Sequence, residues 1–237
     1  MKRLLTLAIN NYGGYNDLRG CLNDQHDIIE FFKGFEITAL TDKEVTVQKT
    51  VTELKRLVTL SEPGDTLVIH YSGHGTQIPD QDGDEEDSYD ESLYLQDGPL
   101  RDDILYGILS ELKDDVDCVV LLDCCFSGTA TRDPFLARMV RLFDIPPSTP
   151  PRRRYIRRDP NTKWVTISGA AEYQTAADAY FEGRNIGAFT YFLLKAYKEG
   201  MTIKEWYNKL RTYLPGAGLT QIPTLEGNKK LFNKTIL

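Results

Sequence analysis

Two apolar runs, each followed by a reactive side chain, constrain the fold of this 237-residue chain most strongly. Val119 to Leu122 is uninterruptedly apolar and leads into Asp-Cys-Cys-Phe-Ser-Gly, and residues 66–71 lead into Ser-Gly-His-Gly. Such runs are typical of strands buried on both faces, as in a parallel sheet covered by helices. Since open α/β sheets bind ligands at the carboxyl ends of their strands, Cys124, Cys125 and His74 are expected at one sheet edge.

The remainder of the chain alternates between strand-like and helix-like patterns. We expect strands over 4–9, 35–40, 66–71, 117–122 and 164–168, and helices over 20–33, 51–60, 103–113, 187–198 and 202–212. Thr50-Val-Thr-Glu53 fits a capping box for the second helix, and residues 78–98 are expected to form an acidic loop. This alternation predicts an α/β fold with a mostly parallel sheet and helices on both faces.

Charge is distributed unevenly along the chain. Residues 80–103 contain eleven Asp or Glu, whereas 152–158 contain five Arg. The net charge of −7 argues against a general affinity for nucleic acids. The stretch 144–161, rich in Pro and Arg, is interpreted as an exposed linker, for which a plain surface loop is the alternative.

The cysteine count and the hydropathy pattern bear on the compartment. The four cysteines are too few and too clustered for a disulfide framework, which favours a reducing, cytoplasmic environment. No apolar run approaches the ~20 residues of a membrane span, so no membrane association is expected. Residues 1–9 have a basic start like that of a signal peptide, but a first strand fits their pattern better.

Three motifs that follow one another in the sequence resemble one protein family. YSGHGTQ at 71–77, DGDEEDSYDE at 82–91 and DCCFSGT at 123–129 resemble the caspase-like cysteine peptidases, in their metacaspase and orthocaspase branch. The separation of 51 positions from His74 to Cys125 agrees with the interval of roughly 50 in caspases. Phe126 stands where the family usually has His.

The resemblance implies a caspase-like sheet sandwiched by helices. It also implies a single catalytic domain over 1–237, with a large-subunit-like part (1–143), the linker (144–161) and a small-subunit-like part (162–237).

Hydrolysis of an amide by a thiol requires a thiolate, a proton carrier and donors for the oxyanion. His74 alone among the three histidines stands between glycines at a strand end. Since successive strand residues point to opposite faces, only one of Cys124 and Cys125 should face the cleft. The resemblance selects Cys125 as nucleophile and leaves Cys124 as a small buried residue. It assigns the oxyanion contacts to the backbone amides of Gly75 and Cys125.

The resemblance also implies an acidic pocket that accepts Arg or Lys before the scissile bond, so that the partners are protein or peptide substrates. The positions that match this pocket are Cys21, Asp24, Ser72 and Asp123. Two carboxylates can hold a guanidinium through charge-assisted hydrogen bonds. On residue type alone, Asp24 is equally well a helix-surface charge and Asp123 a turn residue.

Calcium is the cofactor that the resemblance suggests, and no organic cofactor is expected. The matching positions are Asp90, Asp102 and Asp103, and a merely solvated acidic loop is the alternative. A helix–loop–helix calcium motif is excluded because Glu85 stands where that loop requires Gly.

Self-cleavage in the linker is a further expectation, since its arginines match the inferred pocket. The candidate positions are Arg152, Arg153, Arg154, Arg157 and Arg158. We expect a monomeric endopeptidase. The alternative is a catalytically silent caspase-like module that binds basic peptide segments or calcium.

Overall fold

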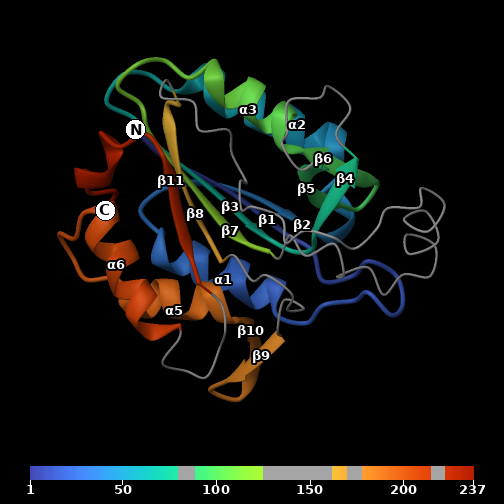
Figure 1. The fold of residues 1–237 in the computed structure, drawn as a ribbon. Helices are drawn as coiled ribbons and strands as arrows, with labels where there is room; N and C mark the ends of the chain where they lie inside the picture. The colour runs from blue at the N-terminus through green and yellow to red at the C-terminus, as the bar shows by residue number, and fades with distance from the viewer. Residues whose placement is uncertain (80–88, 125–161, 170–177, 215–221) are drawn as a thin grey trace.

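The computed structural model describes residues 1–79, 89–124, 162–169, 178–214 and 222–237. Its centre is a six-stranded sheet with the strand order β11-β8-β7-β3-β1-β2 (Figure 1). The strands are β1 (Lys2–Ala8), β2 (Glu36–Thr41), β3 (Thr66–Ser72), β7 (Asp117–Asp123), β8 (Trp164–Ser168) and β11 (Thr224–Gly227). All neighbours are parallel except β11, which runs antiparallel to β8. The predicted mostly parallel α/β fold is therefore confirmed.

Helices cover both faces of this sheet (Figure 1). One face packs against α2 (Val47–Leu60) and α3 (Asp102–Ser110). The other face packs against α1 (Cys21–Phe31), α5 (Ala188–Ala196) and α6 (Ile203–Tyr213). Successive residues of β7 alternate between the two cores, because side chains alternate across a strand: Val120 joins the first core, and Val119 and Leu121 the second. Burial on both faces explains why this strand is continuously apolar.

The start of α2 differs from the prediction. Thr46 is the N-cap residue, and its hydroxyl accepts a hydrogen bond of 3.3 Å from the backbone N–H of Lys49. Thr50 lies inside the helix, is buried, and donates its own N–H to the carbonyl of Thr46 at 2.9 Å. The predicted capping box at Thr50 is therefore wrong, whereas α6 has a true capping box between Thr202 and Glu205.

The predicted loop over 78–98 is also wrong in part. A second, antiparallel sheet is formed by β4 (Gly75–Pro79), β5 (Tyr89–Leu95) and β6 (Gly98–Arg101). Leu93, Leu95 and Leu100 of this sheet are buried in the core under α2 and α3. The burial of these apolar side chains stabilises strands in a segment for which the acidic residues alone predict a loop.

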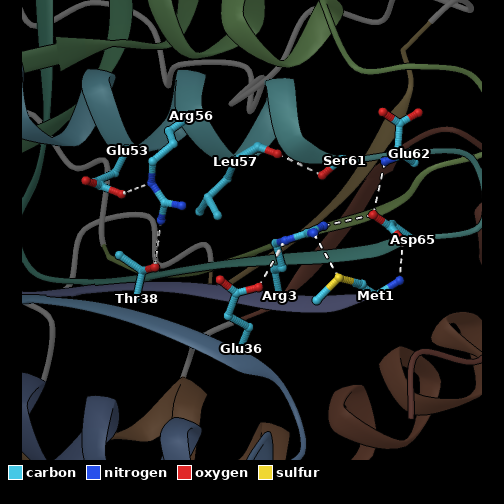
Figure 2. Close-up of polar contacts among 10 residues, drawn as sticks. All are labelled: Met1, Arg3, Glu36, Thr38, Glu53, Arg56, Leu57, Ser61, Glu62 and Asp65. Atoms are coloured by element: carbon cyan, nitrogen blue, oxygen red, sulfur yellow. Dashed lines mark hydrogen bonds and ion pairs between the residues drawn. The ribbon is translucent and has the colours of Figure 1, made fainter.

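A cluster of charged residues joins the amino-terminal ends of β1, β2 and β3 (Figure 2). It therefore lies at the sheet edge opposite to the one formed by the carboxyl ends of these strands. The Arg3 guanidinium donates to Asp65 at 2.8 Å and forms an ion pair with Glu36 at 3.3 Å. Hydrogen bonds from the Met1 amine, from the backbone N–H of Glu62 and from Arg3 lower the pKa of Asp65. Asp65 therefore remains charged and ties β1 to the turn before β3.

Two shorter features complete the described fold. A hairpin of β9 (Asp178–Phe181) and β10 (Arg184–Gly187) leads directly into α5, and the 3₁₀ turns η1 (Asp42–Glu44) and η3 (Leu231–Asn233) follow β2 and β11. No helix in the described part of the chain is both long and apolar enough to span a bilayer.

Candidate active site

The carboxyl ends of β3 and β7 lie side by side, because these parallel strands pair Ser72 with Asp123 at their last residues. His74 follows β3 after a single glycine, and Cys124 follows β7 directly. The sheet therefore brings the His-bearing and Cys-bearing segments to one edge, as the sequence predicts. Cys125 lies outside the described residues, so its pairing with His74 remains a prediction.

The imidazole of His74 is held on one side by the loop that follows β1. Its Nε2 lies 2.7 Å from the backbone carbonyl oxygen of Asn16, and the ring of Tyr12 packs against it with a centroid separation of 4.5 Å. Since a carbonyl oxygen only accepts hydrogen bonds, this contact assigns the imidazole proton to Nε2. In the neutral tautomer the lone pair is then on Nδ1, which can accept a proton.

Cys124 is buried, with 1 % of its surface exposed, and it packs in the core under α2 and α3. This burial agrees with the structural role expected for Cys124. Gly75, the predicted oxyanion donor, is a buried residue that opens β4. Its role as a donor remains a prediction, because its partner in that role is Cys125.

Two buried carboxylates lie next to the end of the sheet. Asp24 of α1 is fully buried and accepts hydrogen bonds of 2.7 Å from the Ser72 hydroxyl and from the backbone N–H of Gly187. Asp123, at the end of β7, accepts hydrogen bonds from the backbone N–H (2.9 Å) and the hydroxyl (2.7 Å) of Thr190 in the first turn of α5. The amino end of α5 thus faces both negative groups, as its dipole favours.

These two carboxylates are close neighbours. A methyl group placed on Gly187 would lie 2.1 Å from Oδ2 of Asp123 and 2.7 Å from Oδ2 of Asp24, so these oxygens are less than 5 Å apart. Burial, followed by the charge of Asp123, raises the pKa of Asp24 well above its usual value. Cys21 lies one turn before Asp24 on α1 and is buried. The predicted pocket residues Asp24, Ser72 and Asp123 are therefore brought together, with Cys21 on the same helix.

The β9–β10 hairpin is docked on α1 by polar contacts. Arg184 makes a bidentate ion pair with Asp27, at 3.0 and 2.6 Å, and the side chain of Asn23 donates to the carbonyl of Asn185 at 2.7 Å. These contacts position the end of β10, including Gly187, against the carboxylate pair.

Four residues that contribute to this site were not identified from the sequence: Tyr12, Asn16, Gly187 and Thr190. The first two lie in the loop at the carboxyl end of β1, and that position was the available signal. The other two lie at the start of the helix predicted over 187–198, to which no functional role was assigned. Their contacts with Asp24 and Asp123 span more than sixty residues of sequence.

The predicted calcium ligands lie around the second sheet. Asp90 belongs to β5, and Asp102 and Asp103 are the first residues of α3, directly after β6. Oδ1 of Asp102 accepts a hydrogen bond of 3.0 Å from the backbone N–H of Asp103. Within the described ranges no three His, Cys, Asp or Glu side chains gather in a way that could hold a metal ion. The calcium site therefore remains a prediction.

The predicted self-cleavage positions and the linker lie outside the described residues. These positions are Arg152, Arg153, Arg154, Arg157 and Arg158. Self-cleavage likewise remains a prediction.

Comparison with known proteins identifies the family to which the chain is similar. Residues 1–232 match the family model of the caspase domain. Metacaspase-1 of Saccharomyces cerevisiae is 36% identical over 151 residues, covering 56% of this chain and 35% of the yeast protein. Metacaspase III c of Phaeodactylum tricornutum is 41% identical over 153 residues, covering 57% of this chain and 45% of that protein. Metacaspase-1B of Aspergillus fumigatus is 28% identical over 281 residues, covering 94% of this chain and 69% of that protein.

The fold has a counterpart among solved structures. A crystal structure of a Geobacter sulfurreducens protein superposes with a TM-score of 0.73 at 26% identity, covering 98% of this chain and 97% of the other. The match to this chain spans less than half the length of the yeast and diatom relatives. Because the caspase-domain match covers nearly the whole sequence, the chain belongs to the caspase-like cysteine peptidases, in their metacaspase branch.

Proposed function

We propose that this chain is a cysteine endopeptidase that hydrolyses peptide bonds after Arg or Lys, with Cys125 as nucleophile and His74 as proton carrier. The observation that carries the proposal is the buried carboxylate pair Asp24 and Asp123, located at the sheet edge that also bears His74.

The charge of this pair supports a basic substrate residue. Asp24 is fully buried and Asp123 is 8 % exposed, so a guanidinium or ammonium group entering the site would contact Asp123 first. Asp24, which is more deeply buried, would attract the same cation through its charge. A substrate carboxylate would meet repulsion there, because a third negative group would join two that already disfavour one another's ionisation.

The reaction follows from the roles of these groups. The thiol proton of Cys125 passes to Nδ1 of His74, and the thiolate attacks the carbonyl carbon of the scissile bond. The backbone amides of Gly75 and Cys125 donate to the oxyanion. The imidazolium returns its proton to the leaving amine, and water then hydrolyses the thioester. The Asn16 carbonyl keeps the proton on Nε2, so the lone pair that takes up and returns the transferred proton is the one on Nδ1.

Turnover of fluorogenic peptides that end in Arg, Lys or Asp tests this proposal. Wild type should cleave the Arg and Lys peptides but not the Asp peptide. Cys125→Ala should abolish cleavage, whereas Cys124→Ala, a matched thiol one residue away, should retain it in the folded protein. If wild type were no faster than Cys125→Ala on every peptide, the silent module that binds basic segments would become the better account.

Calcium stimulation and self-cleavage extend this proposal and rest on the sequence motifs. Addition of calcium or a chelator during the peptide assay tests whether calcium stimulates cleavage. Asp90, Asp102 and Asp103 are the proposed ligands. Mass spectrometry of incubated wild type should find new termini after arginines of 152–158, and Cys125→Ala should remain intact under the same conditions.

A further inference from the structure

The hydroxyls of two tyrosines enclose the backbone of His74. The backbone N–H of His74 donates to Oη of Tyr12 at 2.8 Å. Oη of Tyr71 donates to the carbonyl oxygen of His74 at 2.7 Å and also lies 3.0 Å from the carbonyl oxygen of Tyr94. The two hydroxyl oxygens are 3.2 Å apart. Both peptide groups that flank the Cα of His74 are therefore bound to tyrosine hydroxyls.

The donors in this arrangement can be assigned from the acceptors. Tyr71 has a single hydroxyl hydrogen, and both carbonyl oxygens near it can only accept. Oη of Tyr71 must therefore accept the hydrogen of Tyr12, whose own oxygen accepts from the His74 N–H. The result is a closed ring of hydrogen bonds. Burial raises the pKa of both tyrosines, so their hydroxyls stay protonated and remain donors.

The imidazole of His74 is held by the same loop. The Tyr12 ring packs on it at 4.5 Å between centroids, and the Asn16 carbonyl accepts from Nε2 at 2.7 Å. Tyr12 thus contacts His74 twice, through its hydroxyl on the backbone and through its ring on the side chain. Tyr12 therefore helps to hold both the main chain and the side chain of His74.

The loop itself is fixed at its start. Asp42 accepts hydrogen bonds from the backbone N–H groups of Asn10 (2.8 Å) and Asn11 (3.0 Å), and from the Asn11 side chain at 2.6 Å. These contacts order the chain just before Tyr12. The ring of hydrogen bonds therefore rests on an anchored segment.

Gly73 is the residue that makes the ring possible. A methyl group at this position would lie 2.5 Å from Oη of Tyr12 and 2.5 Å from Oη of Tyr71. Real carbon–oxygen contacts are longer than this, so any side chain at position 73 would separate the hydroxyls. The two tyrosine hydroxyls thus explain, on steric grounds, why the residue before His74 is glycine.

From these contacts we propose that Tyr12 and Tyr71 are positioning residues that hold the His74 imidazole in the orientation needed for proton transfer. The proposal rests on the proposed function of His74. It concerns the rate of the chemical step and not the binding of substrate, because neither tyrosine contributes a contact to Asp24 or Asp123 among the described residues.

Tyr12→Phe keeps the aromatic ring of residue 12 and removes only its hydroxyl. We expect kcat for the Arg peptide to fall roughly tenfold with KM unchanged, because the hydroxyl's hydrogen bonds to the His74 N–H and to Tyr71 are both lost. Tyr94→Phe is the matched control. Its ring lies beside Tyr12 at 6.1 Å and its hydroxyl takes no part in these bonds, so its kcat should equal that of wild type. Equal kcat for both variants, or a change in KM alone, would overturn the proposal.

Imidazole NMR provides a readout that does not require turnover. The chain has three histidines, so the signal of His74 can be assigned against His26 and His70. In wild type the Nε2–H of His74 should be protected from exchange with solvent. Tyr12→Phe should accelerate this exchange at a temperature where the variant remains folded, and Tyr94→Phe should not.

Equal protection in all three proteins would refute the positioning role. So would a loss of kcat that merely follows a loss of folded protein. If wild type showed no turnover at all, the proposed function would fail, and the exchange of Nε2–H would still decide the positioning role.

Discussion

His70 should cause the protein to lose stability in mild acid. It lies in the middle of β3, fully buried, with Nδ1 2.9 Å from the Thr6 hydroxyl. Among the described residues its Nε2 has no hydrogen-bond partner. Burial lowers the pKa of His70 from 6.5 to about 3. In the folded protein the imidazole therefore stays neutral at a pH where an unfolded chain would protonate it.

The sign and the size of the effect follow from this difference. Between pH 6.5 and pH 3 the unfolded state binds more protons, so the contribution of His70 is complete above pH 6.5 and is lost as the pH falls. Well inside this window the loss is about 1.4 kcal/mol per pH unit. From pH 7 to pH 5 the free energy of unfolding should therefore fall by about 2 kcal/mol from this residue alone.

Urea unfolding at pH 7 and pH 5 measures this loss. The background should carry Cys125→Ala, which prevents proteolysis, and the comparison is between His70 and His70→Asn. Asn does not titrate and can still bond to Thr6. The raised pKa of Asp24 acts in the opposite direction, giving stability at low pH that is lost as the pH rises through that pKa.

The Asp24 contribution is common to both proteins and cancels in their difference. We expect the acid-induced loss to be larger for His70 by about 2 kcal/mol. The same loss in both proteins would refute the reasoning, because His70 would then titrate equally in the folded and unfolded states.

Three further predictions concern the carboxylate pair. Thr190→Val removes the hydroxyl donor to Asp123 at nearly constant shape, so kcat/KM for the Arg peptide should fall roughly tenfold. Thr190→Ser keeps a hydroxyl and should keep the wild-type kcat/KM. Equal kcat/KM values for the Val and Ser variants would contradict this prediction. Gly187→Ala should abolish cleavage of the Arg peptide by displacing both carboxylates, whereas Gly107→Ala, which places its methyl in open space on α3, should not. KM for the Arg peptide should fall as the pH rises through the raised pKa of Asp24, and Asp24→Asn should flatten this dependence; an identical pH profile in both proteins would count against the shared charge.

The sequence predicted the sheet well because each of its buried strands has a local signature. Continuous apolar runs marked β3 and β7, and helical spacing marked α1, α5 and α6 within a few residues of their ends. The strands β4 to β6 were missed, since the charges of 78–98 favoured a loop and only tertiary burial of three leucines reveals the sheet. The N-cap of α2 was misplaced because Thr46 and Thr50 both suit a helix start, and packing of Thr50 decides between them.

The candidate site could be predicted only where a motif carries it. The motifs predict Asp24, Ser72 and Asp123, and the structure brings these residues together. The groups that hold the site, Thr190 and Tyr12, come from other elements. Their contacts depend on how α5 and the loop after β1 fold back on the sheet, and no local pattern encodes such a contact.

Covalent labelling by a peptide chloromethyl ketone tests the central claim most directly, because this reagent is held by the pocket and attacked by the nucleophile. Wild type would be incubated with reagents that end in Arg or in Asp, and the labelled peptide identified by mass spectrometry. The account predicts rapid labelling by the Arg reagent, confined to Cys125, and little labelling by the Asp reagent. Labelling at Cys124, or equal labelling by both reagents, would contradict it.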